Sequence, residues 1–143
     1  THSKKNNLNI NYLNTSPEKL KESEKFDVIL NLEIIEHVED VNLYFKSCAR
    51  LLKKDGLMFT ATLNRTFISF IKAIIGAEYI LRWLPIGTHD WNKFLKPKEI
   101  EEKISNLNFS IQEVIGLEFN PFTQKWKRSK DLSVNYIMTS VKD

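Results

Sequence analysis

The 143-residue chain contains a single cysteine, Cys48, which excludes an internal disulfide and is compatible with a reducing cytoplasm. No apolar run reaches the roughly 18 residues that a membrane-spanning helix needs, and the first residues do not resemble a secretory signal. The net charge of +3 is spread along the chain, which gives a nucleic-acid-binding role little electrostatic support. The whole chain has 42% hydrophobic and 27% charged residues, a composition typical of one soluble globular domain with its own core.

Glycine is also scarce. The chain has four glycines, no two of which are close together, and G-x-G does not occur. The first residue is Thr1, so we expect either that an initiator Met was removed or that the chain begins partway through something longer.

Hydrophobic periodicity predicts an α/β architecture. Residues 26–32 (FDVILNL) have the length and β-branched content of a buried strand, and Asp40 is the expected N-cap of a following helix that Gly56 would end in a left-handed conformation. Further strands are expected at residues 8–13, 57–63, 109–119 and 133–141, and further helices at 17–23 and 97–107. The basic stretch 125–128 (KWKR) is expected in a loop that is either solvated or in contact with phosphate.

Residues 66–84 do not continue this alternation of strand and helix patterns, because they are strongly apolar but interrupted by Lys72, Glu78 and Arg82. They predict either a buried core helix or a lid or membrane-surface helix pair that receives an apolar substrate. We expect one domain over residues 1–143, with a lid or insertion segment at 66–92.

Glu33, Glu36 and His37 follow the buried strand at spacings that would place them on one side of a helical turn. Such a set is commonly only a solvated face. As ligands, two carboxylates and an imidazole would suit Mg²⁺, Mn²⁺ or Zn²⁺ at the strand end where open α/β sheets bind ligands. A zinc-protease motif is excluded because position 33 is Glu rather than His.

Three longer segments carry a family resemblance: VILNLEIIEHVEDV, LLKKDGLMFTATLNRT and GAEYILRWLPIGTHDWNKFLKP, with FNPF and DLSVNY further on. Together they resemble the ubiquinone-biosynthesis O-methyltransferases, from about residue 8 to residue 141. The resemblance implies S-adenosylmethionine-dependent methylation of a catechol hydroxyl on a polyprenylated ring. It also implies the cofactors S-adenosylmethionine and Mg²⁺.

The resemblance assigns roles to eight residues. Glu33, Glu36 and His37 fall on the family's magnesium ligands. Leu32 falls on a backbone contact to the methyl donor, and Asn14 and Thr15 lie where related enzymes approach the adenine. Asn64 would face the substrate cleft, and His89 would act as a base or support one.

The chain departs from the family in its first half. The resemblance implies a truncated Rossmann-like class I methyltransferase sheet, the carboxyl-terminal portion of that fold, without its first two strands and its glycine-rich loop. Residues 26–32 would then have an unpaired hydrophobic edge. We expect residues 1–25 to be the least ordered part, or residues 8–13 to pair directly with 26–32.

Two functions are considered first, and a third, a generic methyltransferase with another small-molecule substrate, is less well supported because the signature motifs are specific to the group. One is catalysis by this portion of a magnesium-dependent O-methyltransferase, in the cytoplasm or peripherally on the inner face of a membrane. The other is an inactive remnant that binds a membrane surface or a partner chain through residues 66–84. The expected partners are a polyprenylated catechol, and a missing amino-terminal half or a second chain.

Overall fold

The structure is a computed structural model that describes residues 5–21, 23–71, 74–75, 85, 87, 90–120 and 123–143. In chain order its elements are η1 (Pro17–Lys19), β1 (Phe26–Leu32), η2 (Ile35–His37), α2 (Val41–Leu51), β2 (Leu52–Leu63), α3 (Phe67–Ser69), η4 (Trp91–Lys93), α4 (Pro97–Ser105), β3 (Phe109–Asn120), β4 (Lys125–Ser129) and β5 (Asn135–Lys142).

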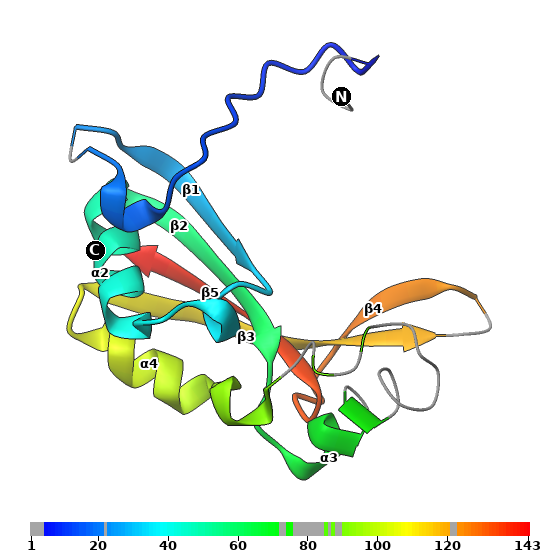
Figure 1. Ribbon diagram of the computed structural model, residues 1–143. Coiled ribbons are helices and arrows are strands. Elements are labelled where there is room, and N and C mark those ends of the chain that lie inside the picture. Colours follow the sequence, from blue (N-terminus) through cyan, green and yellow to red (C-terminus); the bar gives the residue numbers. More distant parts are fainter. Residues whose placement is uncertain are drawn as a thin grey trace.

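The strands form one five-stranded sheet in the order β1-β2-β5-β3-β4 (Figure 1). β1 and β2 are parallel and joined through α2, as the alternation of strand and helix patterns predicted, while the other neighbours are antiparallel. The carboxyl ends of β1 and β2 therefore lie side by side at the same end of the sheet.

A helix layer formed by α2 and α4 covers one face of the sheet (Figure 1). Asp40 caps α2 as predicted, since its side chain accepts hydrogen bonds from the backbone N–H groups of Asn42 and Leu43 at 2.9 and 3.0 Å. The buried core between helices and strands contains Ile35, Tyr44, Phe45, Cys48, Ala49, Leu52, Met58, Ile100, Ile104, Phe109, Tyr136 and Met138.

The expected glycine cap of α2 is wrong. The helix ends at Leu51, and the left-handed residue in the connection is Asp55, with φ 60°. Gly56 is needed for a different reason: a Cβ there would lie 2.9 Å from the Lys53 carbonyl oxygen and 3.1 Å from that of Asp27. The glycine thus lets β2 pass close to β1.

Residues 8–13 do not form the expected strand, and they do not pair with β1. They are exposed and leave the body of the molecule (Figure 1). An alternating pattern becomes a strand only where a neighbour completes its hydrogen bonds, and the described residues provide none here. The expected helix at 17–23 is reduced to the short turn η1, whose Pro17 carbonyl accepts a hydrogen bond from Arg50 Nη2 at 3.1 Å.

The predicted hydrophobic edge is confirmed. β1 is the terminal strand of the described sheet, and Val28, Leu30 and Leu32 are exposed on the face opposite the helix layer. Asn31, which points the other way, is buried beneath α2. Within the described part of the chain this strand is therefore covered on one face alone.

The basic stretch 125–128 is a strand rather than the expected loop. β4 pairs with the second half of β3, with Phe119 opposite Trp126 and Glu118 opposite Lys127. Lys127 Nζ lies 3.1 Å from Glu118 Oε2, and Arg128 forms an ion pair with Glu113. Much of the positive charge on this strand is therefore matched within the hairpin.

The apolar segment 66–84 is only partly described. Thr66 caps the short helix α3 in a capping box with Ser69, and Phe67, Ile68, Ile71 and Ile75 are exposed. Residues 72–73 and 76–84 lie outside the described residues. Ser69 is buried and Phe70 packs edge-on against Trp91, so the described part of the segment has an exposed apolar face and an inward one, and the choice between core helix and lid stays a prediction.

Candidate functional site

The candidate site begins at the residue that follows β1. Glu33 adds one more hydrogen bond to the pairing of β1 with β2, because its N–H donates to the Ala61 carbonyl oxygen at 2.9 Å. The chain then turns at Glu33, whose φ is 51°. This left-handed conformation costs a non-glycine residue about 1–2 kcal/mol. Strain of this kind is concentrated at functional sites, which makes Glu33 a candidate on geometric grounds.

Glu36 turns inward beside it. The Glu36 residue is only 3% exposed, and its Oε2 accepts a hydrogen bond from Thr62 Oγ1 on β2 at 2.9 Å. Its other oxygen, Oε1, is buried without a hydrogen-bond partner among the described residues. A buried carboxylate oxygen with no donor is costly, so this position favours a bound proton, water or cation.

Glu33 and Glu36 affect each other electrostatically. Glu33 is exposed to solvent at its surface, but desolvation by the surrounding protein raises the pKa of its carboxyl, and the adjacent Glu36 carboxyl raises it further, to about 8. Two neighbouring carboxylates resist being charged together unless a positive group lies between them. The pair therefore has the donor chemistry of a divalent-cation site.

His37 does not join this pair in the structure. The single helical turn that was expected through all three residues starts only at Ile35, after the left-handed Glu33, so the spacing argument for a shared side fails. His37 is exposed, and among the described residues no group of three or more His, Cys, Asp or Glu side chains is placed to hold a metal. The two carboxylates fit a cation, whereas the predicted third ligand is not brought to them.

Asn64 ends β2 at the same edge of the sheet. It is 8% exposed, its Nδ2 donates to the Leu132 carbonyl oxygen at 2.8 Å, and its backbone N–H donates to that of Val134 at 2.9 Å. Its Oδ1 is buried and has no partner among the described residues. Glu36 Oε1 and Asn64 Oδ1 are the two buried side-chain atoms of this kind in the described chain, and both belong to residues that the sequence singled out.

The remaining predicted residues are more scattered. Leu32 ends β1 beside Glu33, paired with Ala61, so its backbone lies at the predicted edge. Asn14 and Thr15 immediately precede η1, which Arg50 holds near the amino end of β1, and the structure does not bring them to Glu33. Their contact with adenine stays a prediction. His89 lies outside the described residues.

A pocket of about 290 Å³ opens beside Glu33. The described residues that line it are Glu33, Ala61, Leu117, Trp126, Asn135, Tyr136 and Ile137. Sequence reasoning missed Trp126 because the whole KWKR stretch was interpreted as a basic loop. The alternation of Lys125, Trp126 and Lys127 was the available signal, since it has the two-residue period of a strand.

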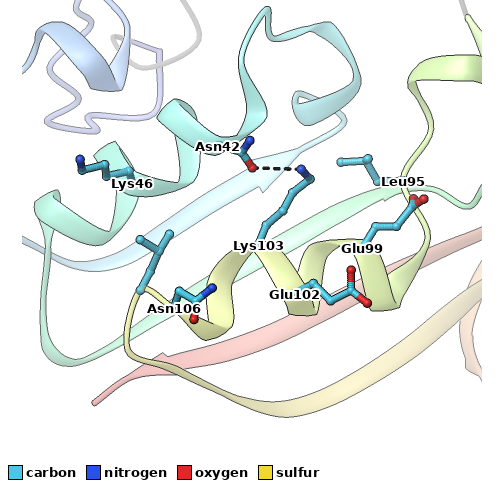
Figure 2. A pocket seen from close by; sticks show the side chains of 8 residues that line it. Asn42, Lys46, Leu95, Glu99, Glu102, Lys103 and Asn106 are labelled. Carbon is cyan, nitrogen blue, oxygen red and sulfur yellow. Dashed lines mark hydrogen bonds between the residues drawn. The ribbon is translucent and has the colours of Figure 1, made fainter.

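A larger groove of about 540 Å³ lies between α2 and α4 (Figure 2). Figure 2 shows Lys103 reaching across it, where Nζ donates to Asn42 Oδ1 at 2.9 Å. Charged residues of both signs line the groove, among them Lys46, Glu99 and Glu102. Leu95 and Leu107 add apolar surface to the groove, which belongs to the helix layer and does not include the strand ends.

A family model described as "Methyltransferase domain" matches residues 2–114, and the chain belongs to this family. The curated relatives include the ubiquinone biosynthesis O-methyltransferase of Pelagibacter ubique, 53% identical over 142 residues, and that of Bartonella tribocorum, 54% identical over 138 residues. The matches cover 99% and 96% of this chain but 59% and 56% of the relatives. The chain thus spans little more than half the length of these relatives, and the resemblance predicted from its motifs is confirmed.

Solved structures place the fold in the same class. An S-adenosylmethionine-dependent methyltransferase from Clostridium acetobutylicum aligns with a TM-score of 0.65 at 12% identity, over 99% of this chain and 68% of that one. A methyltransferase from Thermotoga maritima, described as a possible histamine N-methyltransferase, aligns with a TM-score of 0.64 at 17% identity, over 90% and 62%. The class I methyltransferase fold predicted from the sequence is confirmed. As for membranes, no helix among the described residues is long and apolar enough to cross one.

Proposed function

We propose that this chain provides the substrate side of an S-adenosylmethionine-dependent O-methyltransferase of ubiquinone synthesis, acting on a catechol hydroxyl of a polyprenylated ring. The observation that carries the proposal is the Glu33–Glu36 pair at the carboxyl ends of β1 and β2, next to a pocket of about 290 Å³. Open α/β sheets bind their ligands at this edge. The relatives at 53% and 54% identity supply the reaction class.

In this proposal Glu33 and Glu36 hold a divalent cation, Mg²⁺ by the resemblance, and Thr62 fixes the orientation of Glu36 through its hydrogen bond. A bound cation of this type supplies positive charge that lowers the pKa of a hydroxyl beside it. The hydroxyl oxygen then forms a bond to the methyl carbon as the bond from that carbon to sulfur breaks. The hydroxyl proton leaves to a base, for which His89 stays the proposed residue, and the sulfonium becomes a neutral thioether.

Asn64 contributes a fixed acceptor in the same proposal. Its amide nitrogen is already used by Leu132, so Oδ1 is the atom left to accept a hydrogen bond from a substrate hydroxyl or a water. Positioning of this kind contributes to catalysis because methyl transfer needs oxygen, carbon and sulfur in line.

The test is a calorimetric titration of the chain with S-adenosylmethionine and catechol, with and without Mg²⁺. We expect micromolar binding of the donor, and catechol binding that strengthens when Mg²⁺ is present. Glu36→Gln should remove the effect of Mg²⁺, whereas Glu39→Gln, an exposed carboxylate three residues away, should not. Absence of donor binding under all conditions contradicts the proposed activity for this chain.

A second candidate function has its own observation. We also propose that the segment around α3 contacts a membrane surface, because Phe67, Ile68, Ile71 and Ile75 are apolar and exposed. Co-flotation with phospholipid vesicles tests this. Phe67→Ser should reduce flotation, and Phe26→Ser, at an exposed apolar position on β1, is the matched control. Equal flotation of both variants would contradict the assignment to α3.

A polypeptide partner is the last element of the proposal. Val28, Leu30 and Leu32 present an apolar, unpaired strand edge, and the chain spans 59% of the Pelagibacter relative. The occupant we propose is a chain that adds a strand beside β1 and covers this face.

A further inference from the structure

The hairpin of β3 and β4 carries an exposed aromatic pair. Phe119 and Trp126 lie opposite each other across the two strands, with ring centroids 5.1 Å apart and planes inclined at 46°. Trp126 is 61% exposed and Phe119 is 38% exposed. Tryptophan is highly buried on average, and large aromatic side chains left in the open are enriched where another molecule binds.

The hairpin holds this pair in place. Five cross-strand residue pairs join β3 to β4, and the ion pairs Lys127–Glu118 and Arg128–Glu113 flank the aromatic residues. Lys125 and Lys127 are the neighbours of Trp126 along the strand, so by the alternation of a strand they point to its other face. The two rings therefore form a fixed apolar surface on one face of the hairpin.

This surface faces the candidate site. Trp126 and Glu33 line the same pocket, although they are 93 positions apart in the sequence. Between them lie the apolar side chains of Ala61, Leu117 and Ile137. The lining of the pocket thus combines an aromatic side chain, apolar residues and a carboxylate, together with Asn135 and Tyr136, and such a combination suits a flat ring that carries polar substituents.

The size of the pocket limits its ligand. A protein cavity of about 150 Å³ holds benzene, so about 290 Å³ has room for one ring with its substituents. A polyprenyl chain does not fit in the same volume and must leave through the opening.

We propose that Trp126, with Phe119 beside it, is the platform on which the aromatic ring of the substrate stacks, with the hydroxyl edge of the ring directed toward Glu33. The inference rests on the proposed function, because it takes the ring to be the one that is methylated. It adds the residues that select an aromatic substrate, which neither the motifs nor the relatives assign.

The experiment follows ring binding without requiring turnover. In a ¹⁵N-labelled chain the indole N–H of Trp126 gives its own NMR resonance. The resonance is assigned by its loss in Trp126→Phe. The chain is then titrated with catechol while this resonance is followed. We expect a saturable shift of this resonance, and no such shift with cyclohexanediol, which has the two hydroxyls but no aromatic ring. Trp126→Ala should weaken catechol binding about fivefold or more, while Trp126→Phe should retain most of the affinity.

Lys125→Ala is the matched control, since it truncates the neighbouring residue on the other face of β4 and should leave catechol affinity unchanged. Urea unfolding of each variant shows that the hairpin is intact. A Trp126 resonance that does not move, or equal affinity in Trp126→Ala and Lys125→Ala, overturns the platform.

The same variants separate this inference from the function on which it rests. If the wild-type chain methylates catechol and Trp126→Ala does so with unchanged KM, the platform is wrong and the function stands. If catechol shifts the Trp126 resonance but the wild-type chain transfers no methyl group, the platform stands and the function is wrong.

Discussion

Glu33 combines a strained backbone conformation with a carboxyl group in an unfavourable electrostatic environment. Its backbone has φ 51°, and its pKa is raised to about 8 by desolvation and by Glu36. Glu33→Gly removes the backbone strain, since glycine adopts positive φ without a steric penalty, and it also removes the carboxylate. We expect the free energy of unfolding at pH 8, without divalent cations, to rise by about 1 kcal/mol, measured by urea denaturation.

The matched control for this change is Glu39→Gly, because Glu39 is exposed and has no positive φ. That variant should be neutral or slightly destabilising, since glycine only adds freedom to the unfolded chain. If Glu33→Gly is no more stable than Glu39→Gly, the strain assigned to Glu33 is absent.

Cys48 shows at the same scale how burial removes reactivity. It lies in the core, where burial raises the pKa of its thiol to about 12. Because only the thiolate is nucleophilic, we expect almost no reaction with an aromatic disulfide reagent at pH 8 in the folded chain. One thiol should react promptly once denaturant is added. Fast labelling of the folded chain would show that α2 does not pack as described.

At the scale of elements, α2 is joined to the sheet by a buried polar contact. Tyr44 Oη donates to Asn31 Oδ1 at 2.9 Å, and burial raises the pKa of Tyr44, so the hydroxyl keeps its proton. Tyr44→Phe leaves Asn31 Oδ1 buried without this donor. We expect a loss of about 1–3 kcal/mol in unfolding free energy, measured in urea.

Tyr12→Phe is the control for that loss, because it removes the same hydroxyl from a residue in the exposed stretch before η1. It should leave stability unchanged. Equal stability of the two variants would mean that the bond from α2 to β1 contributes nothing.

The open edge of β1 has a consequence for the behaviour of the chain in solution. Leu30 is 61% exposed on β1, whose outer edge has no partner strand among the described residues, and apolar edges of this kind associate with one another. We expect concentration-dependent self-association in size-exclusion chromatography with light scattering, which Leu30→Lys reduces. Leu43→Lys introduces the same charge at an exposed position on α2 and should leave the association unchanged.

In the molecule as a whole, the face of β1 that no described residue covers predicts complementation by a second chain. The part of the Pelagibacter relative outside the matched 59% is the partner to add. We expect a one-to-one complex with this chain, and tighter binding of S-adenosylmethionine by the complex than by the chain alone, measured by light scattering and calorimetry. Leu30→Lys should weaken the complex. Absence of a complex at tens of micromolar would contradict a polypeptide partner at β1.

Features that depend on neighbouring residues could be predicted from the sequence. The apolar run of β1, the Asp40 cap of α2 and the start of α4 at Pro97 were all predicted within a residue or two. Each follows from an interaction within one or two turns or from a short hydrophobic run. The motifs after β1 also identified the family, which the relatives confirm.

Other features need a hydrogen-bond partner that the pattern of a single segment does not contain. β4 forms because β3, its neighbour in the hairpin, supplies its hydrogen bonds, and residues 8–13 stay outside the sheet because no described strand supplies theirs. Glu33 has a left-handed backbone, Glu36 is buried and His37 is exposed, an arrangement that the helical spacing of the three residues did not predict. Trp126 and Glu33 line one pocket because β1, β2, β5 and β3 pair in that order, and this long-range register is the part of the site that local patterns do not contain.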